Sequence, residues 1–295
     1  MEITIEAPRN FSFRRTALSH GWYDLPPFGF DASRWALTRV VALDEDRAVT
    51  VEITGAKGGV AARVAARPGK RDVRKITRDV RHMLRLDDDM SEFYSAVRRE
   101  PDFKWIARAG AGRLLRSPTV FEDLVKTICT TNCSWALTKK MIEGLVSGLG
   151  RPAGDGRRAF PTPELMAGAP EEFYRDVVRA GYRAPYLKEL AARAASRQID
   201  VEGWLASEMD SDSLKREMKK VKGAGDYAAE NLLRLVGRYE GLALDSWVRA
   251  KFARARNGGE VATDREIENY YSRFGSWRGL ALWCDMTRDW LEEEL

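Results

Sequence analysis

The 295-residue chain is poor in the side chains that bind transition metals. It has three cysteines, Cys129, Cys133 and Cys284, and two histidines, His20 and His82. No zinc quartet and no iron-sulfur spacing can be assembled from this set, so we expect no metal centre of that kind. Cys129 and Cys133 lie four residues apart in "ICTTNCS". They are interpreted as two small core residues, with a redox pair as the less favoured alternative.

Long hydrophobic runs are also missing. The longest, "VVAL" at 40–43 and "GLALW" at 279–283, are far shorter than the roughly 20 residues that a membrane-spanning helix needs. The first residues, "MEITIEAPRN", lack the basic and apolar regions of a signal peptide. These absences predict a protein that does not associate with membranes and lies in the cytoplasm.

Charge of neither sign dominates, because 49 basic residues face 44 acidic ones, with a net charge of +5 and a pI near 9.1. This balance leans only slightly towards polyanionic partners. Its distribution is more informative. The segment "LKREMKKVK" at 214–222 is strongly basic, whereas the C-terminal "DMTRDWLEEEL" is acidic. Basic charge therefore gathers immediately before a glycine-rich turn.

Hydrophobic periodicity changes near residue 70. Before it, segments rich in Val, Ile and Thr alternate with turn residues, as in "ITIEA", "RWALTRVVAL", "AVTVEITG" and "VAARVAA", which predicts a small antiparallel sheet. After it, apolar residues recur at helical spacing almost to the end. We therefore predict an α+β fold, with a β-rich N-terminal domain at 1–70 and an all-α region at 71–295.

The turn "KGAGDY" joins two predicted helices. Glycines allow a tight turn and close approach of a ligand to the backbone, and the following helix N-terminus favours an anion such as a DNA phosphate. A plain glycine-capped turn is the alternative. Asp245 follows in the apolar context "LALDSWVRAKF", where it is either a partly desolvated acid or simply a helix N-cap. No strand precedes the turn, which disfavours dinucleotide binding.

The combination of a Gly-x-Gly hairpin with a later aspartate resembles the helix-hairpin-helix DNA glycosylases. Residues 117–150 are similar to the segment that carries the DNA-wedge loop in 8-oxoguanine glycosylases and AlkA-type alkylbase glycosylases. "AGYRAPYLKELAARA" at 180–194 resembles a helix start of the same enzymes. Their small N-terminal sheet domain also agrees with the β-rich segment predicted here.

The resemblance implies that the partner is double-stranded DNA with a damaged base, bound by a monomer in a cleft between two helical sub-bundles. It makes Asp245 the catalytic carboxylate. It assigns phosphate binding to the hairpin and places a wedge or opposite-strand set nearby. These sets are, respectively, Lys220, Lys222, Gly223, Ala224 and Gly225; and Asn132, Tyr182 and Arg183. The alternatives are a helix cap for Asn132, a core position for Tyr182 and a surface phosphate contact for Arg183. No cofactor is required, although hairpin carbonyls in this family can hold a monovalent cation.

Tyr227 stands two residues after the second hairpin glycine, where strand-cutting family members carry a nucleophilic lysine. The resemblance therefore implies a monofunctional enzyme that uses water and leaves an abasic site. Aromatic residues that can stack on a base complete the predicted pocket: Tyr227, Trp22, Tyr23, Trp247 and Trp283. The damaged base stays open, since "ICTTNC" and "AGYRA" favour the 8-oxoguanine branch and Tyr227 favours the alkylbase branch. A non-catalytic DNA-binding protein is the alternative, and Asp245 separates the two.

Overall fold

The N-terminal part of the chain forms one antiparallel sheet. The structure is a computed structural model that describes residues 1–65 and 67–291. The sheet has the strand order β1-β5-β4-β3-β2. Its strands are β1 (Glu2–Glu6), β2 (Phe28–Asp31), β3 (Ala36–Ala42), β4 (Ala48–Ala56) and β5 (Gly59–Val64). The predicted α+β class is confirmed. Only β2 was missed, because "FGFD" is short and follows two prolines.

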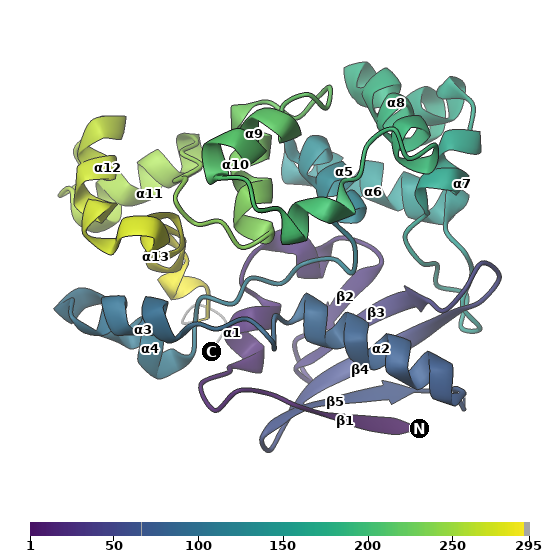
Figure 1. The fold of residues 1–295 in the computed structure, drawn as a ribbon, viewed down its shortest axis with the longest axis horizontal. Helices are drawn as coiled ribbons and strands as arrows, with labels where there is room; N and C mark the ends of the chain where they lie inside the picture. The colour runs from purple at the N-terminus through teal and green to yellow at the C-terminus, as the bar shows by residue number, and fades with distance from the viewer. Residues whose placement is uncertain (66, 292–295) are drawn as a thin grey trace.

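Helix α2 (Lys70–Met83) runs along the sheet (Figure 1) and buries Ile76, Val80 and Met83. The change in periodicity near residue 70 therefore coincides with its start. Between β1 and β2 lie two short elements that the sequence did not predict, α1 (Phe13–Ala17) and η1 (Gly21–Asp24). The second of these carries Trp22.

The remaining helices divide between two hydrophobic cores. One group shares a core with the sheet and α2. It consists of α5 (Val120–Thr130), α6 (Trp135–Leu149), α7 (Pro163–Gly168), α8 (Ala184–Ala195), α9 (Ser211–Met218) and α10 (Asp226–Leu235). The other group builds a second core. It consists of α3 (Ser91–Arg98), α4 (Lys104–Ala109), α11 (Ser246–Arg256), α12 (Asp264–Tyr271) and α13 (Arg278–Met286).

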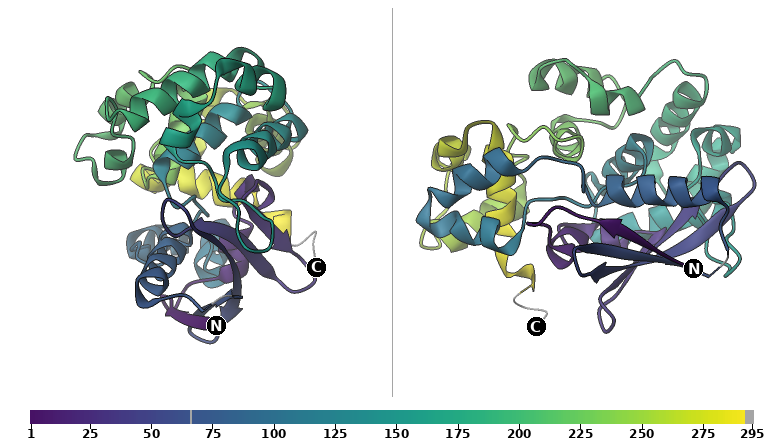
Figure 2. Two further views of the ribbon diagram at one scale, coloured as in Figure 1. Left: turned by 90° about the vertical axis from the view of Figure 1, so that its right-hand side faces the viewer. Right: turned by 60° about the horizontal axis from the view of Figure 1, so that its bottom comes forward.

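Short helical turns connect these elements. They are η2 (Pro101–Phe103), η3 (Phe173–Val177), η4 (Gly181–Arg183), η5 (Glu202–Ala206), η6 (Ser272–Trp277) and η7 (Arg288–Leu291). Figure 2 shows the sheet at one end of the molecule and most helices at the other. None of the helices within the described ranges is long and apolar enough to cross a membrane.

The chain crosses between the two cores three times, the last time between α10 and α11. Helices α3 and α4 leave the sheet region and lie beside the C-terminal helices (Figure 1), and residues 110–119 then return to α5. The sheet and helices α5–α10 share one hydrophobic core. The predicted boundary between two domains at residue 70 therefore stays a prediction. The arrangement places the space between the two cores next to the N-terminal ends of α10 and α11, which carry Tyr227, Asp245 and Trp247.

Candidate active site

The two hairpin glycines occupy different environments between α9 and α10. Gly223 has φ +90°, and a Cβ atom there would lie 3.2 Å from side-chain atoms of both Ile128 and Tyr186. Gly225 is the N-cap of α10 with φ −70°, and nothing lies within 4 Å of its would-be Cβ. Because no side chain caps this helix, its first amides are free of a side-chain partner. The first glycine is thus required by the fold, and the second leaves backbone open to a ligand.

The basic run before the hairpin is balanced by acids. All of its lysines are partly or fully exposed, and each forms an ion pair: Lys215 with Glu230, Lys219 with Asp226, Lys220 with Glu217 and Lys222 with Glu189. The concentration of positive charge predicted from the sequence is therefore reduced by Glu217 within the run and by three acids on other segments. Exposed pairs of this kind contribute little to stability, so Lys220 and Lys222 remain candidates for phosphate contacts.

Asp245 caps α11 and also lines a cavity. Its backbone is extended (φ −123°), and its Oδ1 accepts a hydrogen bond of 2.7 Å from the amide of Val248. It borders a cavity of about 610 Å³ between the two cores. Oδ2 has no protein hydrogen-bond partner among the residues that the structure describes. The two interpretations of this aspartate are therefore compatible, because one oxygen caps the helix while the other stays available.

Two side chains of α10 hold the loop that leads to Asp245, and the sequence analysis missed both. Glu230 Oε2 accepts a 2.7 Å hydrogen bond from the amide of Ala243, whose φ is +49°. Arg234 Nη2 donates to the carbonyl of Leu242 at 3.0 Å. Glu230 and Arg234 follow Tyr227 by three and seven residues, a spacing that places all three on one face of the helix. This spacing was the signal in the sequence from which both residues could have been predicted.

Four of the five predicted base-pocket residues line this cavity: Trp22, Tyr227, Trp247 and Trp283. Tyr227 and Trp247 are 38% and 37% exposed, so their rings are accessible. Partial burial, with a contribution from Asp245, raises the pKa of the Tyr227 phenol. The fifth residue, Tyr23, lies outside the cavity and packs edge-on against Phe30 at 5.7 Å.

Two further tryptophans complete the lining. Trp290 packs against Trp247 and Trp283 with ring centroids 5.9 and 5.8 Å apart. Trp135, the first residue of α6, lines the cavity beside Gly21, where a Cβ atom would lie 2.5 Å from its ring. No local pattern in the sequence distinguishes these two from core tryptophans.

A buried polar network holds Trp22 in the cavity wall. Its indole Nε1 donates to Asp123 Oδ1 at 2.7 Å, and the amide of Ser117 donates to the same oxygen at 2.9 Å. Behind it, Glu122 pairs with Arg39 at 2.6 Å and with Lys126 at 2.7 Å. Burial raises the pKa of Asp123 and lowers that of Lys126 to about 8. These contacts fasten η1 to α5 and thereby fix one wall of the cavity.

His20 lines the cavity next to Trp22, with ring centroids 4.8 Å apart. Its Nε2 lies 2.5 Å from the carbonyl of Leu115. Burial lowers the pKa of His20 to about 4, so the ring is neutral at pH 7. Because a carbonyl can only accept, Nε2 carries the proton and Nδ1 keeps its lone pair.

The predicted wedge residues separate into two environments. Asn132 is exposed in the α5–α6 turn with φ +47°, and its Nδ2 is 3.5 Å from the hydroxyl of Tyr182, which is also exposed. Arg183 is buried, and its guanidinium donates to the carbonyls of Ile128 and Thr131. Arg183 therefore supports the turn from inside. Its burial corrects both the predicted opposite-strand contact and the alternative of a surface phosphate contact, because each needs an exposed guanidinium.

The two neighbouring cysteines lie in different environments. Cys129 is buried and Cys133 borders the cavity, and both are free thiols. The described residues contain no group of three or more His, Cys, Asp or Glu side chains that could hold a metal ion. A monovalent cation at the hairpin carbonyls stays a prediction.

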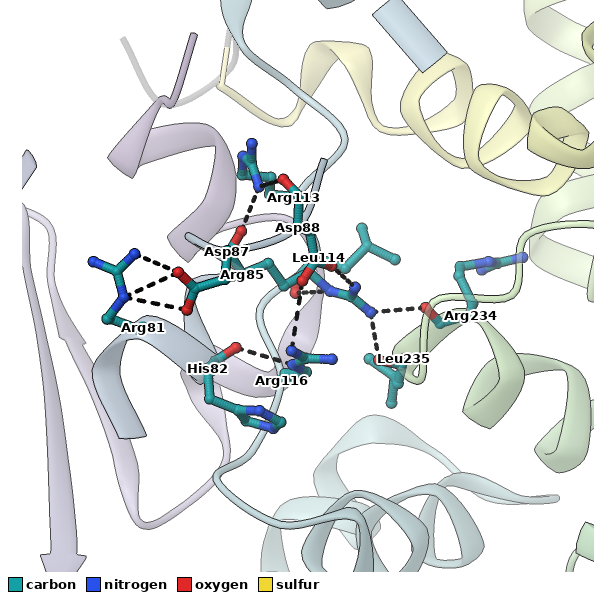
Figure 3. Close-up of polar contacts among 10 residues, drawn as sticks. All are labelled: Arg81, His82, Arg85, Asp87, Asp88, Arg113, Leu114, Arg116, Arg234 and Leu235. Atoms are coloured by element: carbon teal, nitrogen blue, oxygen red, sulfur yellow. Dashed lines mark hydrogen bonds and ion pairs between the residues drawn. The ribbon is translucent and has the colours of Figure 1, made fainter. Parts of the chain in front are cut away.

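An arginine cluster ties α10 to the segments that cross between the cores (Figure 3). Arg85 donates to the carbonyls of Leu114, Arg234 and Leu235 and pairs with Asp88. Arg113 and Arg116 donate to carbonyls of the same region, those of Asp88 and His82 at 2.9 Å each. Figure 3 shows the side chain of Arg234 leading away from this cluster. The C-terminal end of α10 is thus fixed on one side, while Arg234 extends on the other.

The fold of this chain is similar to the folds of solved DNA glycosylases. The fold matches the 3-methyladenine DNA glycosylase of Archaeoglobus fulgidus with a TM-score of 0.74 at 20% identity, covering 99% of both chains. It matches an 8-oxoguanine glycosylase/lyase of Clostridium acetobutylicum, solved with double-stranded DNA containing cytosine opposite 8-oxoguanine, with a TM-score of 0.75 at 18% identity, covering 99% of this chain and 98% of that one.

A curated relative from Methanothermobacter thermautotrophicus, "Probable N-glycosylase/DNA lyase", is 24% identical over 194 residues. The match spans 58% of this chain and 61% of that relative. Residues 125–276 match the family described as "HhH-GPD superfamily base excision DNA repair protein", a range that contains the hairpin and Asp245. The chain therefore belongs to the HhH-GPD superfamily of base excision DNA repair proteins.

Proposed function

We propose that this protein is a monofunctional DNA glycosylase that extrudes a damaged base from double-stranded DNA and hydrolyses its N-glycosidic bond, leaving an abasic site. One observation carries the proposal: a single cavity joins Asp245 to a wall of aromatic rings beside a helix-hairpin-helix. Its volume of about 610 Å³ is in the range of small-molecule sites. A flipped base stacked on these rings would recover part of the unstacking cost.

Asp245 is assigned the chemical step. Loss of the base develops positive charge on the deoxyribose, and a carboxylate held close to it in a water-poor site stabilises that charge and orients water. The hydrogen bond from Val248 to Oδ1 fixes the direction of the carboxylate. Glu230 and Arg234 hold the preceding loop, so the distance between Asp245 and a bound sugar is set by α10.

The hairpin is assigned the DNA backbone. The uncapped N-terminus of α10 and the open space at Gly225 suit a phosphate oxygen. A monovalent cation at the hairpin carbonyls would add to this contact. Asn132 and Tyr182, exposed near one another, are the candidates for filling the gap left by the extruded base.

The positions of the lysines support the proposal that the enzyme has no lyase step. A Schiff base requires an uncharged lysine at the sugar, and no lysine lines the cavity in the described part of the chain. Tyr227, which lines the same cavity as Asp245, stands where strand-cutting family members carry the nucleophilic lysine. The curated relative is named as a probable N-glycosylase/DNA lyase. We therefore propose that this chain differs from its relative in lacking the lyase activity.

The test uses duplexes that carry 3-methyladenine, 1,N6-ethenoadenine, hypoxanthine, uracil or 8-oxoguanine, analysed with and without alkali. After incubation with the protein, we expect strand breaks at one or more of these lesions only in the samples that are then treated with alkali. Asp245→Asn should abolish them, because asparagine still caps a helix but carries no charge. Asp210→Asn is the matched control, since Asp210 caps α9 in the same way. No alkali-labile product from any duplex, with DNA affinity retained, would identify a non-catalytic DNA-binding protein.

A further inference from the structure

A buried arginine without an acidic partner forms part of the cavity wall. Arg234 is 4% exposed and lines the cavity together with Asp245 and Tyr227. Its contacts are the carbonyl of Leu242 at 3.0 Å and the face of Trp283 at 5.1 Å. Within the described ranges it makes no ion pair, and its Nε has no hydrogen-bond partner. This Nε is fully buried, so a ligand in the cavity cannot reach it. Nη1 also has no hydrogen-bond partner among the described residues but is not fully buried, so it is the donor that a ligand in the cavity can satisfy.

The guanidinium of Arg234 stays charged although it is buried. Burial lowers the pKa of Arg234 to about 10, which still leaves it a cation at pH 7–8. The acid nearest in sequence, Glu230, is engaged by Lys215 and by the amide of Ala243. Asp245 is the carboxylate that lines the cavity, and its assigned partner is the sugar. A base that enters the cavity therefore meets a positive charge with an uncommitted donor.

We propose that Arg234 determines base specificity: it admits neutral bases that carry a carbonyl oxygen and excludes bases whose ring carries a positive charge. A carbonyl supplies the acceptor that the guanidinium lacks, whereas a ring cation is repelled at short distance in a low-dielectric site. This inference rests on the proposed glycosylase function and narrows it to neutral oxo-bases.

His20 gives the same wall a second polar element. Its Nδ1 keeps a lone pair because Nε2 is directed at Leu115, so it accepts rather than donates. A base edge with an N–H next to a C=O offers one group to His20 and one to Arg234. Hypoxanthine, uracil and 8-oxoguanine have such an edge. 1,N6-ethenoadenine is neutral but has no carbonyl, and 7-methylguanine and 3-methyladenine are cationic in DNA.

The test is single-turnover excision by the unmodified 295-residue chain on duplexes with hypoxanthine, 8-oxoguanine, 1,N6-ethenoadenine or 7-methylguanine. Each rate is divided by the spontaneous rate of loss of the same base, because cationic purines leave faster without any enzyme. We expect the largest enhancement for an oxo-purine and the smallest for 7-methylguanine. If 7-methylguanine shows the larger enhancement, the charge assignment is wrong while the glycosylase function stands. If no base is released, the proposed function itself fails.

Variants then assign the effect to the residue. Arg234→Gln keeps a donor for Leu242 but removes the charge, and should narrow the preference for oxo-purine over 7-methylguanine at least about 10-fold. Arg238→Gln is the control, since Arg238 donates to Ser207 and does not line the cavity. An unchanged preference in a folded Arg234→Gln protein would overturn the proposal. If that variant does not fold, the wild-type ranking decides.

Discussion

Replacing each hairpin glycine by alanine separates two roles that a Gly-x-Gly motif combines. Gly223 has φ +90°, and its new methyl group would lie 3.2 Å from Ile128 and Tyr186. The left-handed backbone costs about 1–2 kcal/mol for alanine, and the crowding adds about 1 kcal/mol or more. We therefore expect Gly223→Ala to lower the free energy of unfolding by about 2–3 kcal/mol, which lowers the Tm by roughly 5 °C in a chain of this size.

Gly225→Ala should behave differently. Its φ of −70° suits alanine, and the methyl group meets nothing within 4 Å. Loss of a glycine N-cap costs up to about 1 kcal/mol, while the stiffer unfolded chain offsets about 0.4–1 kcal/mol, so stability should stay within about 1 kcal/mol of wild type. The methyl group nevertheless lies in the proposed path of the phosphate. Loss of one charge-assisted hydrogen bond would weaken DNA binding about 10- to 100-fold.

Thermal unfolding and fluorescence anisotropy with a duplex that carries an abasic-site analogue measure the two effects. Gly154→Ala is the control, because Gly154 also has open space around it but lies in the loop before α7. The reasoning is refuted if Gly225→Ala destabilises the protein as much as Gly223→Ala does. It is refuted equally if Gly225→Ala binds DNA as tightly as the Gly154→Ala control.

Three further predictions concern pH, the loop before Asp245 and salt. The pKa of His20 is about 4 in the folded protein against an ordinary 6.5; the unfolded chain therefore takes up a proton first, and the free energy of unfolding should fall by up to about 3 kcal/mol from pH 6.5 to pH 4. His20→Gln should flatten this slope in urea titrations, and an unchanged slope would contradict the assignment. Glu230→Ala should reduce single-turnover excision more than Glu230→Gln, which can still accept from Ala243; equal losses would mean that Glu230 acts only through its pair with Lys215. Changing Lys219, Lys220 and Lys222 to Ala should reduce the slope of log K against log salt by up to about 3, and an unaltered slope would mean that these lysines do not face DNA.

Local features could be predicted well from the sequence because they depend on neighbouring residues. Helix α11 begins directly after Asp245, as the N-cap interpretation of this residue expects, because a cap lies in the same segment as the helix that it begins. The hairpin and four of the five strands were equally local. Four of the aromatic residues that line the cavity were selected through the family resemblance rather than through any periodic pattern: Trp22, Tyr227, Trp247 and Trp283. Trp135 and Trp290, which also line it, were not predicted.

Features that depend on distant parts of the chain could not be predicted. Helices α3 and α4 pack against helices more than a hundred residues later, and nothing in their own pattern specifies that partner. Arg183 was expected at the surface, but it is buried because the carbonyls of Ile128 and Thr131 accept its donors. The acids that offset the hairpin lysines include Glu189 on α8, whose proximity only the fold reveals.

Borohydride trapping tests the central claim most directly. The protein is incubated with a duplex from which it releases a base, sodium borohydride is added, and the products are separated under denaturing conditions. Because Tyr227 cannot form a Schiff base and no lysine lines the described cavity, we expect no covalent protein–DNA adduct and strand breaks only after alkali. A trapped adduct, or strand breaks without alkali, would contradict the assignment of a monofunctional, water-dependent reaction to this site.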